Sequence, residues 1–262
     1  MLPSCHVCAC IMKYIDLVLY KSYVELRRDI VETYFGFLWW IIEPLLYMVA
    51  FYLVFSTGLR AGGNNYISFL LCGLVPWKWF ASTVNQSCMS LVSNRGLIQQ
   101  VYLPKIIFPF IPAAVNFLKF LFMAMILIIF LWIMGFSPHW NWLLLIPVIC
   151  LQFCLTLGIG LMVAALVPFF MDLRVLVTNG LTMLMFLSGI FYDVSTFPED
   201  IKNYFYFNPM VIIIETYRNI LLHAELPSLH SFGLVALESF TLILAASVIL
   251  IKLDKKYPKV LL

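Results

Sequence analysis

The sequence predicts an all-helical integral membrane protein. Of its 262 residues, 63% are hydrophobic and only 11% are charged, whereas soluble domains average about 25% charged residues. The mean hydropathy is +0.99, and a folded chain of this length cannot hide so much apolar surface from water. Because backbone groups in hydrocarbon have no water to bond, each membrane span is expected to be a helix. The net charge of +3 is too small to indicate a nucleic-acid partner.

Six segments are apolar enough to cross a bilayer, which takes about 20 residues. The fifth is the shortest of them. The six expected spans are 36–56, 67–92, 107–134, 142–168, 175–192 and 232–251.

The distribution of basic residues indicates the orientation of the six spans. Both termini and the second and fourth loops lie on one side, which carries 11 Lys and Arg residues against 3 on the other. Basic residues accumulate in cytoplasmic loops, so we expect both termini in the cytoplasm. The chain is then one transmembrane domain, 13–262, preceded by an extension of unknown role, 1–12.

Residues 13–35 show a two-sided helical pattern. Charged residues recur at helical spacing on one side and apolar residues on the other, which predicts a helix lying in the membrane interface. It serves either as a plain topology anchor or in docking and gating. The charged face holds Lys21, Glu25, Arg28, Asp29 and Glu32, and the apolar face Ile15, Val18, Leu19, Leu26 and Ile30.

The external segment 193–230 is too apolar for a solvated loop, yet its apolar runs are too short to span. Thr196 and Glu199 fit a capping box, and Asn208 followed by Pro209 fits a helix N-cap and first position. We therefore predict two short re-entrant helices, from about Pro198 and Pro209. The alternative is an amphipathic loop lying on the surface.

The sequence lacks the motifs of common enzyme sites. It has no GxxxxGK[ST] phosphate loop, no HExxH and no GxSxG, and no acid–base pair with catalytic spacing is apparent. The cluster Cys5, His6, Cys8 and Cys10 is too tightly spaced for the usual zinc pairs, and no second ligand set follows. We therefore expect no enzymatic activity, metal or cofactor on this chain.

Four ionisable residues fall inside the expected spans. Such groups cost about 2.5–3.5 kcal/mol at depth, so they usually face a cavity or a partner. Structural pairing, for example of Lys119 with Glu238, and contact with a substrate both remain open. The four candidates are Glu43, Lys78, Lys119 and Glu238.

Aromatic residues make up 16% of the chain. Interfacial aromatic belts are ordinary in membrane proteins, but some of these rings could instead line a conduit. The C–H groups of a sugar pack on aromatic faces, and conduction needs contacts that are weak enough to release the cargo. The conduit candidates are Trp39, Trp40, Tyr47, Trp77, Trp79, Phe80 and Tyr192.

A set of short motifs, in order along the chain from about Lys13, resembles the polysaccharide-exporting ABC transporter permeases. These motifs are Gly36-Phe37-Leu38-Trp39 with Pro44, then Gly73, Trp77 and Phe80, the stretch 94–105, Gly158 and Gly160, Asp172-Leu173, Ser188 and Ile190, Asn208-Pro209, and Tyr217-Arg218.

The resemblance implies a homodimer in the bacterial inner membrane with two copies of a separate ATPase subunit, which would hold ATP and Mg. It also implies export of O-antigen, capsule or teichoic acid polymers, usually linked to a lipid carrier. The family often has Arg before the Asp of the fourth loop, where this chain has Met171. By the resemblance, ATPase coupling falls to Arg27, Arg28, Asn94, Arg95, Gln100, Pro104, Lys105, Asp172 and Arg174, and the exit region to Pro198, Asn208, Pro209, Tyr217 and Arg218.

Other functions remain as alternatives. A related ABC permease could carry another polymer, a lipid or a drug, and aromatic conduits with outer re-entrant helices favour the polymer. A membrane-embedded transferase would need a polar cluster that the sequence does not display. An ion channel would need a charged ring or a filter sequence, and neither is visible.

Overall fold

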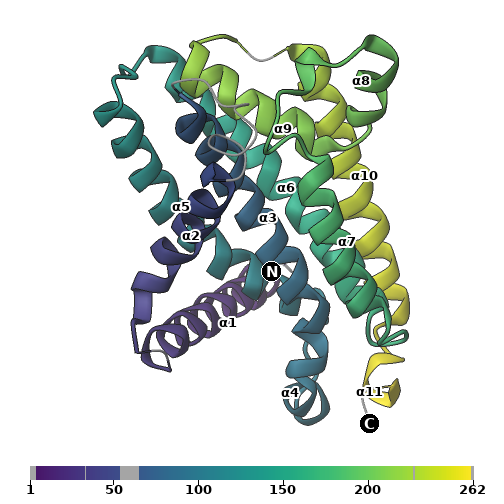
Figure 1. The fold of residues 1–262 in the computed structure, drawn as a ribbon. Coiled ribbons are helices and arrows are strands. Elements are labelled where there is room, and N and C mark those ends of the chain that lie inside the picture. The colour runs from purple at the N-terminus through teal and green to yellow at the C-terminus, as the bar shows by residue number, and fades with distance from the viewer. Residues whose placement is uncertain (1–3, 33, 54–64, 227, 261–262) are drawn as a thin grey trace.

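A computed structural model describes residues 4–32, 34–53, 65–226 and 228–260. Within these ranges every regular element is helical. The long helices run lengthwise through one bundle, except for α1, which slants across its lower half (Figure 1). The all-helical architecture that the composition predicts is confirmed.

Four stretches are long and apolar enough to cross a membrane: Tyr66–Ser93, Ile107–Ile133, Trp140–Leu166 and His230–Leu253. They agree with four of the expected spans to within a few residues. They are formed by α3 (Tyr66–Ser93), α5 (Ile107–Ile133), a 3-10 turn (Trp140–Leu144) with α6 (Leu145–Leu166), and α10 (Leu229–Leu253).

The other two expected spans form shorter helices. After a 3-10 turn at Gly36–Leu38, α2 covers Trp39–Tyr52, and α7 covers Leu173–Leu187. The 14 described residues of α2 and the 15 residues of α7 correspond to about 21 and 23 Å of helix, against a hydrocarbon core of about 30 Å. Residues 54–56 of the expected first span lie outside the described residues. The expected fifth span ends early because the chain turns at Gly189, which has a φ of +67°.

The core of the bundle lies between α3, α6 and α10, with α5 packed on α3. Two glycines allow the backbones to approach closely. A Cβ added at Gly158 would lie 3.0 Å from the Cβ of Leu242 on α10, and one at Gly160 would lie 2.9 Å from the Oγ of Ser87 on α3. Small residues of this kind let membrane helices pack by van der Waals contact.

Helix α1 covers Ser4–Val31, so it begins before and ends before the predicted amphipathic segment 13–35. Its apolar side chains Ile15, Leu19 and Ile30 are exposed on the outside of the bundle. The side chain of Asp29 instead reaches α5, where it contacts Lys119. Asp29 therefore faces the protein while these three apolar side chains face outward, which suits a helix whose outer side meets lipid.

The two ends of the bundle carry different short helices. Helices α4 (Arg95–Gln100) and α11 (Tyr257–Val260) lie at one end, called here the α4 end. Helices α8 (Glu199–Phe205) and α9 (Pro209–Arg218) lie at the opposite, α8 end (Figure 1). A π-helical turn, Asn219–His223, extends α9.

The helix starts predicted near Pro198 and Pro209 are confirmed by α8 and α9. The side chain of Asn208 accepts the Met210 N–H at 3.0 Å and caps α9, with Pro209 at its first position. The predicted capping box of Thr196 and Glu199 is wrong. Pro198 precedes α8 without a side-chain cap, and the Thr196 hydroxyl donates to the Asp193 carbonyl instead. A local backbone acceptor therefore competes successfully for the Thr196 hydroxyl.

Candidate functional site: a polar track along α3

One face of α3 is polar although the helix is otherwise apolar. Three cavities, of about 400, 150 and 240 Å³, lie along this face and share lining residues. Gln86 lines the first and second, Lys78 and Ser82 line the second and third, and Asn85 lines the first and third. Because the cavities adjoin, they form one continuous feature, called here the polar track. It leads from Asn94 at the α4 end to Lys78, near the middle of α3.

The first cavity opens between α1, α3, α5 and the start of α7. Charges of both signs line it, from Glu25, Arg28 and Asp29 on α1 and from Arg174 on α7. Burial raises the pKa of Glu25 above its ordinary value, and the charge of Lys21 acts in the opposite direction. This cavity therefore offers both hydrogen-bond donors and acceptors to a hydrated ligand.

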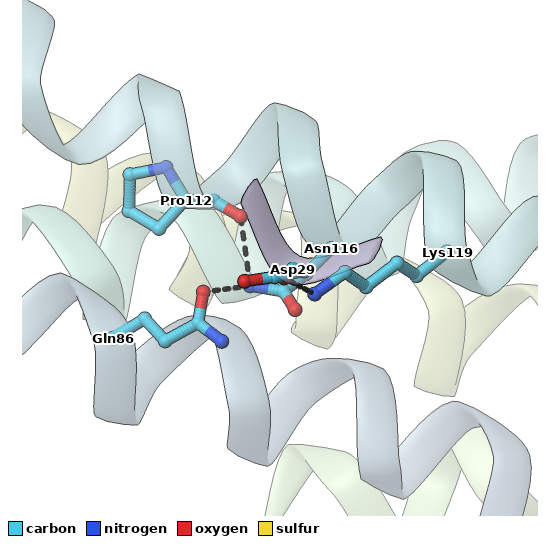
Figure 2. Close-up of polar contacts among 5 residues, drawn as sticks. All are labelled: Asp29, Gln86, Pro112, Asn116 and Lys119. Atoms are coloured by element: carbon cyan, nitrogen blue, oxygen red, sulfur yellow. Dashed lines mark hydrogen bonds and ion pairs between the residues drawn. The ribbon is translucent and has the colours of Figure 1, made fainter. Parts of the chain in front are cut away.

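Figure 2 shows polar contacts where the first and second cavities meet: Gln86, Asn116 and Lys119 line the second cavity, and Asp29 and Pro112 line the first. Asn116, only 3% exposed, donates through Nδ2 to the Gln86 side-chain oxygen at 2.8 Å and to the Pro112 carbonyl at 2.9 Å. Lys119 Nζ lies 2.5 Å from Asp29 Oδ2 and 5.5 Å from the centre of the Trp40 ring. These contacts join α1, α3 and α5 within the bundle.

The suggested pairing of Lys119 with Glu238 is wrong. Lys119 pairs with Asp29 of α1, whereas Glu238 is exposed on α10. Helix α1, which the sequence pattern does not place against any span, brings a closer carboxylate than α10 does.

The third cavity lies between α2, α3 and α7. Lys78 forms an ion pair with Glu43 of α2, and its Nζ lies 5.1 Å from the centre of the Tyr47 ring. On the other side, the Thr178 hydroxyl donates to the Asn85 side-chain oxygen at 3.0 Å. Three of the four predicted buried charges, Glu43, Lys78 and Lys119, therefore line the polar track.

The predicted conduit aromatics fall into separate groups. Trp40, Tyr47, Trp77 and Trp79 border the track, the last two from the buried core, where Trp79 stacks on a neighbouring ring of α5. The remaining three lie elsewhere: Trp39 is exposed at the start of α2, Phe80 is buried in the core, and Tyr192 donates its hydroxyl to the Phe186 carbonyl. Whether any of these rings contacts a sugar stays a prediction.

Most of the predicted coupling residues gather at the α4 end. The side chain of Asn94 accepts a hydrogen bond from Lys21 Nζ at 3.2 Å, which joins α1 to the end of α3. Pro104 is partly buried, between α4 and α5. The exposed members are Arg27 and Arg28 on α1, Arg95 and Gln100 on α4, and Asp172 and Arg174 at the start of α7.

Lys105 differs from these exposed residues because it is only 2% exposed. Its Nζ lies 3.5 Å from Asp254 Oδ1, and its backbone N–H donates to the same oxygen at 3.4 Å. Tyr102 donates to the other oxygen of Asp254 at 3.0 Å, and this bond raises the pKa of Tyr102. Tyr257, fully buried, donates to the Ala165 carbonyl at 3.0 Å. The C-terminal tail therefore holds the loop after α4.

Sequence reasoning did not find Asp254. It stands among the lysines of the tail, in a pattern typical of a solvated end. Its partner lies 149 positions away along the chain, so no local signal could have indicated the contact.

Replacing Asp254 with asparagine is expected to lower the free energy of unfolding by about 2 kcal/mol, because buried Lys105 loses its counter-charge. Thermal unfolding in detergent measures the effect. The matched change Asp200→Asn, at an exposed carboxylate of α8, should leave the unfolding temperature unchanged. Equal unfolding temperatures for the two variants would show that the Lys105–Asp254 pair contributes no stability.

At the α8 end, Arg218 anchors α9 to the turn after α7. Arg218 is only 6% exposed, and its guanidinium donates to the carbonyls of Phe69, Gly189 and Ile190 at 3.2, 2.7 and 2.7 Å. Asn208 Nδ2 also reaches this turn, at 2.9 Å from Ser188 Oγ. Two of the predicted exit residues thus fix the connection between α7 and α9. Of the other three, Tyr217 is buried, Pro198 is exposed, and Pro209 is the first residue of α9.

Comparison with known proteins gives relatives that match most of the chain. An O-antigen export system permease protein RfbA of Klebsiella pneumoniae is 29% identical over 247 residues, covering 94% of this chain and 95% of the relative. One from Myxococcus xanthus is 28% identical, covering 85% and 86%. The polysialic acid transport protein KpsM of Escherichia coli is 26% identical, covering 84% and 85%.

A family model described as ABC-2 type transporter matches residues 23–222. The matched range includes the last part of α1, from Tyr23, the whole of the polar track and helices α8 and α9. The chain therefore belongs to the ABC-2 type transporter family.

Proposed function

We propose that this chain is the membrane subunit of an ABC transporter that exports a lipid-linked polysaccharide, similar to O-antigen, across the bacterial inner membrane. The polar track is the observation that carries the proposal, because a hydrophilic cargo needs polar groups along its route, and the track reaches from the α4 end to the middle of the bundle. The support from relatives is that their names specify O-antigen export and polysialic acid transport.

In this proposal the chain crosses the membrane six times, with both termini in the cytoplasm. Helices α2 and α7 are the short spans, and both run lengthwise beside the long helices (Figure 1). The excess of basic residues at the α4 end supports a cytoplasmic location for that end. Helices α8 and α9 then form the re-entrant region on the outer side, where they cap the exit.

The chain itself is not an enzyme in this proposal. Two copies of a separate ATPase subunit bind a homodimer of the chain, and they hold the ATP and Mg. The lack of a phosphate loop in the sequence supports this division of labour. The exposed side chains Arg95 and Gln100 on α4, with Arg27 and Arg28 on α1, provide a polar surface for that partner. ATP can drive the cycle only if the two conformations differ in their affinity for it.

A double substitution on α4, Arg95→Glu with Gln100→Glu, tests the coupling. Export of labelled polysaccharide in a deletion strain is expected to fall by about tenfold or more. A tenfold loss corresponds to about 1.4 kcal/mol of coupling free energy between the permease and the ATPase subunit. The amount of inserted permease, measured by immunoblot of membranes, should not change. The matched control Lys256→Glu, an exposed tail residue, should retain export. Normal export by the α4 variant would contradict the coupling role.

The same strain tests the substrate. Deleting the gene should leave the polysaccharide on the inner face of the membrane, and the wild-type chain should restore its export. If polysaccharide export is normal in the deletion strain while a lipid or a drug accumulates, the alternative permease function holds. If the purified chain alone hydrolyses ATP or transfers a sugar, the division between permease and ATPase is wrong.

A further inference from the structure

The two lysines of the polar track lie on helices with many buried side chains, whereas their carboxylate partners lie on helices with few. Lys78 belongs to α3 and Lys119 to α5, which both contribute many buried side chains to the core. Their carboxylate partners, Glu43 and Asp29, belong to α2 and α1. The lysines are thus fixed in the bundle, and the carboxylates come with the N-terminal segment.

The N-terminal segment, α1 with the following turn and α2, packs weakly against the rest of the chain. Among its described side chains none of α2 is buried, and in α1 only Ser22 is. Its polar contacts with the rest of the bundle include Asp29 to Lys119, Glu43 to Lys78, Lys21 to Asn94, and Ser22 to the Ile111 carbonyl. Elements with few buried apolar contacts are those that move most readily.

In the second cavity each lysine is paired with a carboxylate of the N-terminal segment. The described lining of this cavity includes both lysines but one carboxylate, Glu43, while Asp29 reaches Lys119 from the first cavity. If the N-terminal segment withdrew, both ammonium groups would stay in the track without a counter-charge. An uncompensated charge at such depth costs about 2.5–3.5 kcal/mol, so an anion that replaced the carboxylates would be bound favourably.

We propose that Lys78 and Lys119 bind an anionic group of the cargo in exchange for Glu43 and Asp29. The ligand is an oxyanion, either the phosphate groups of a lipid carrier or the carboxylate of an acidic sugar. Gln86 supplies further donors, because Asn116 occupies its side-chain oxygen and leaves its amide N–H groups for the ligand. This inference rests on the proposed function.

Exchange of partners explains why ion pairs stand in a transport route. The lysines are compensated both before and after the anion arrives, so neither state carries a large desolvation penalty. The anion favours the conformation in which the N-terminal segment has withdrawn, and it can do so only through this difference in affinity. Return of the two carboxylates then releases the cargo.

A charge swap separates this role from a purely structural pair. In Asp29→Lys with Lys119→Asp the attraction is kept, but the lysine now belongs to the mobile segment. The single variant Lys119→Asp should lower the unfolding temperature, and we expect the swap to restore it. Export should nevertheless stay about tenfold or more below wild type, because one charge-assisted contact with the cargo is lost. Recovery of export together with the unfolding temperature would overturn the proposal. The swap of Glu43 with Lys78 should behave in the same way.

Direct binding provides a second measurement, which is independent of export and of folding of the swapped chains. Purified permease in phosphatidylcholine nanodiscs is titrated by calorimetry with farnesyl diphosphate, farnesol and glucuronate. If the lipid carrier is the source of the anion, farnesyl diphosphate binds about tenfold or more tightly than farnesol, and Lys119→Gln removes the difference while Lys256→Gln does not.

If an acidic sugar is the source, glucuronate binding shows the same dependence on Lys119. If neither anion binds in a lysine-dependent way, the proposal is overturned. These outcomes differ from failure of the proposed function, in which the wild-type chain would not restore polysaccharide export to the deletion strain whatever anion it binds.

Discussion

Replacing Arg218 with methionine is expected to destabilise the fold by about 3 kcal/mol, the largest effect of any single substitution that we anticipate. Methionine fills most of the space of the side chain but cannot donate to a carbonyl. The carbonyls of Phe69, Gly189 and Ile190 would lose their donor in a buried site. The guanidinium also lies 3.4 Å from the centre of the Phe69 ring, a contact that would be lost as well.

The effect can be measured as chemical unfolding in detergent and as the amount of chain inserted in membranes. Arg218→Lys should be intermediate, since one ammonium group cannot reproduce the planar fork that reaches three acceptors. Arg27→Met, at an exposed arginine of α1, is the matched control and should be neutral. Equal stability of the Arg218 and Arg27 variants would show that the three hydrogen bonds contribute nothing.

Gly73 offers an independent probe of the same site. A Cβ added there would lie 2.8 Å from a terminal nitrogen of Arg218, which is already held by the carbonyls. Gly73→Ala should therefore displace the guanidinium and destabilise the fold in the same direction as Arg218→Met. In the background of Arg218→Met, the alanine should cost less, because the two changes act on one contact.

The second large effect is expected for Gly158→Val. The added side chain would meet Leu242 Cβ at 3.0 Å and the backbone nitrogen of Ile243 at 3.3 Å. Since the backbone of α10 cannot move aside locally, α6 and α10 must separate along their length. Overpacking of this kind costs about 1–3 kcal/mol, and the loss of close helix contact adds to it.

Unfolding measurements in the same detergent test this expectation. Gly233→Val is a matched control, because it places the same β-branched residue in a helix of this pair, at a position where an added Cβ has no neighbour within 4 Å. We expect Gly233→Val to change the free energy of unfolding much less than Gly158→Val does. If the two valine variants unfold alike, the close approach of α6 and α10 at Gly158 is not a source of stability.

Several features follow from the chain without any tertiary information. The apolar content and the lengths of the apolar runs are sufficient to indicate a helical membrane protein and its four long spans, because a lipid environment imposes helical hydrogen bonding on each run separately. The starts of α8 and α9 are also local, since Pro198 ends an extended stretch and Asn208 caps its own helix. The amphipathic pattern of 13–35 likewise predicts α1, though not its first residue.

The pairing of charges could not be obtained in this way. Asp29 and Lys119 lie 90 positions apart, and Lys105 and Asp254 lie 149 apart. An ionisable residue in a span indicates that some partner exists, but several carboxylates satisfy that requirement equally, and Lys119 pairs with Asp29 rather than with the suggested Glu238. The resemblance places Arg218 in the exit region. Its hydrogen bonds to three carbonyls form only when α3, α7 and α9 are packed together.

The sequence was therefore sufficient for the class of protein and most of its helices, because backbone hydrogen bonding and transfer of apolar surface depend on short runs of residues. The polar track, the two ion pairs within it and the tail that holds Lys105 needed the folded chain. Each depends on which helix faces come into contact, and contact between distant faces is set by the shape and packing of the whole bundle.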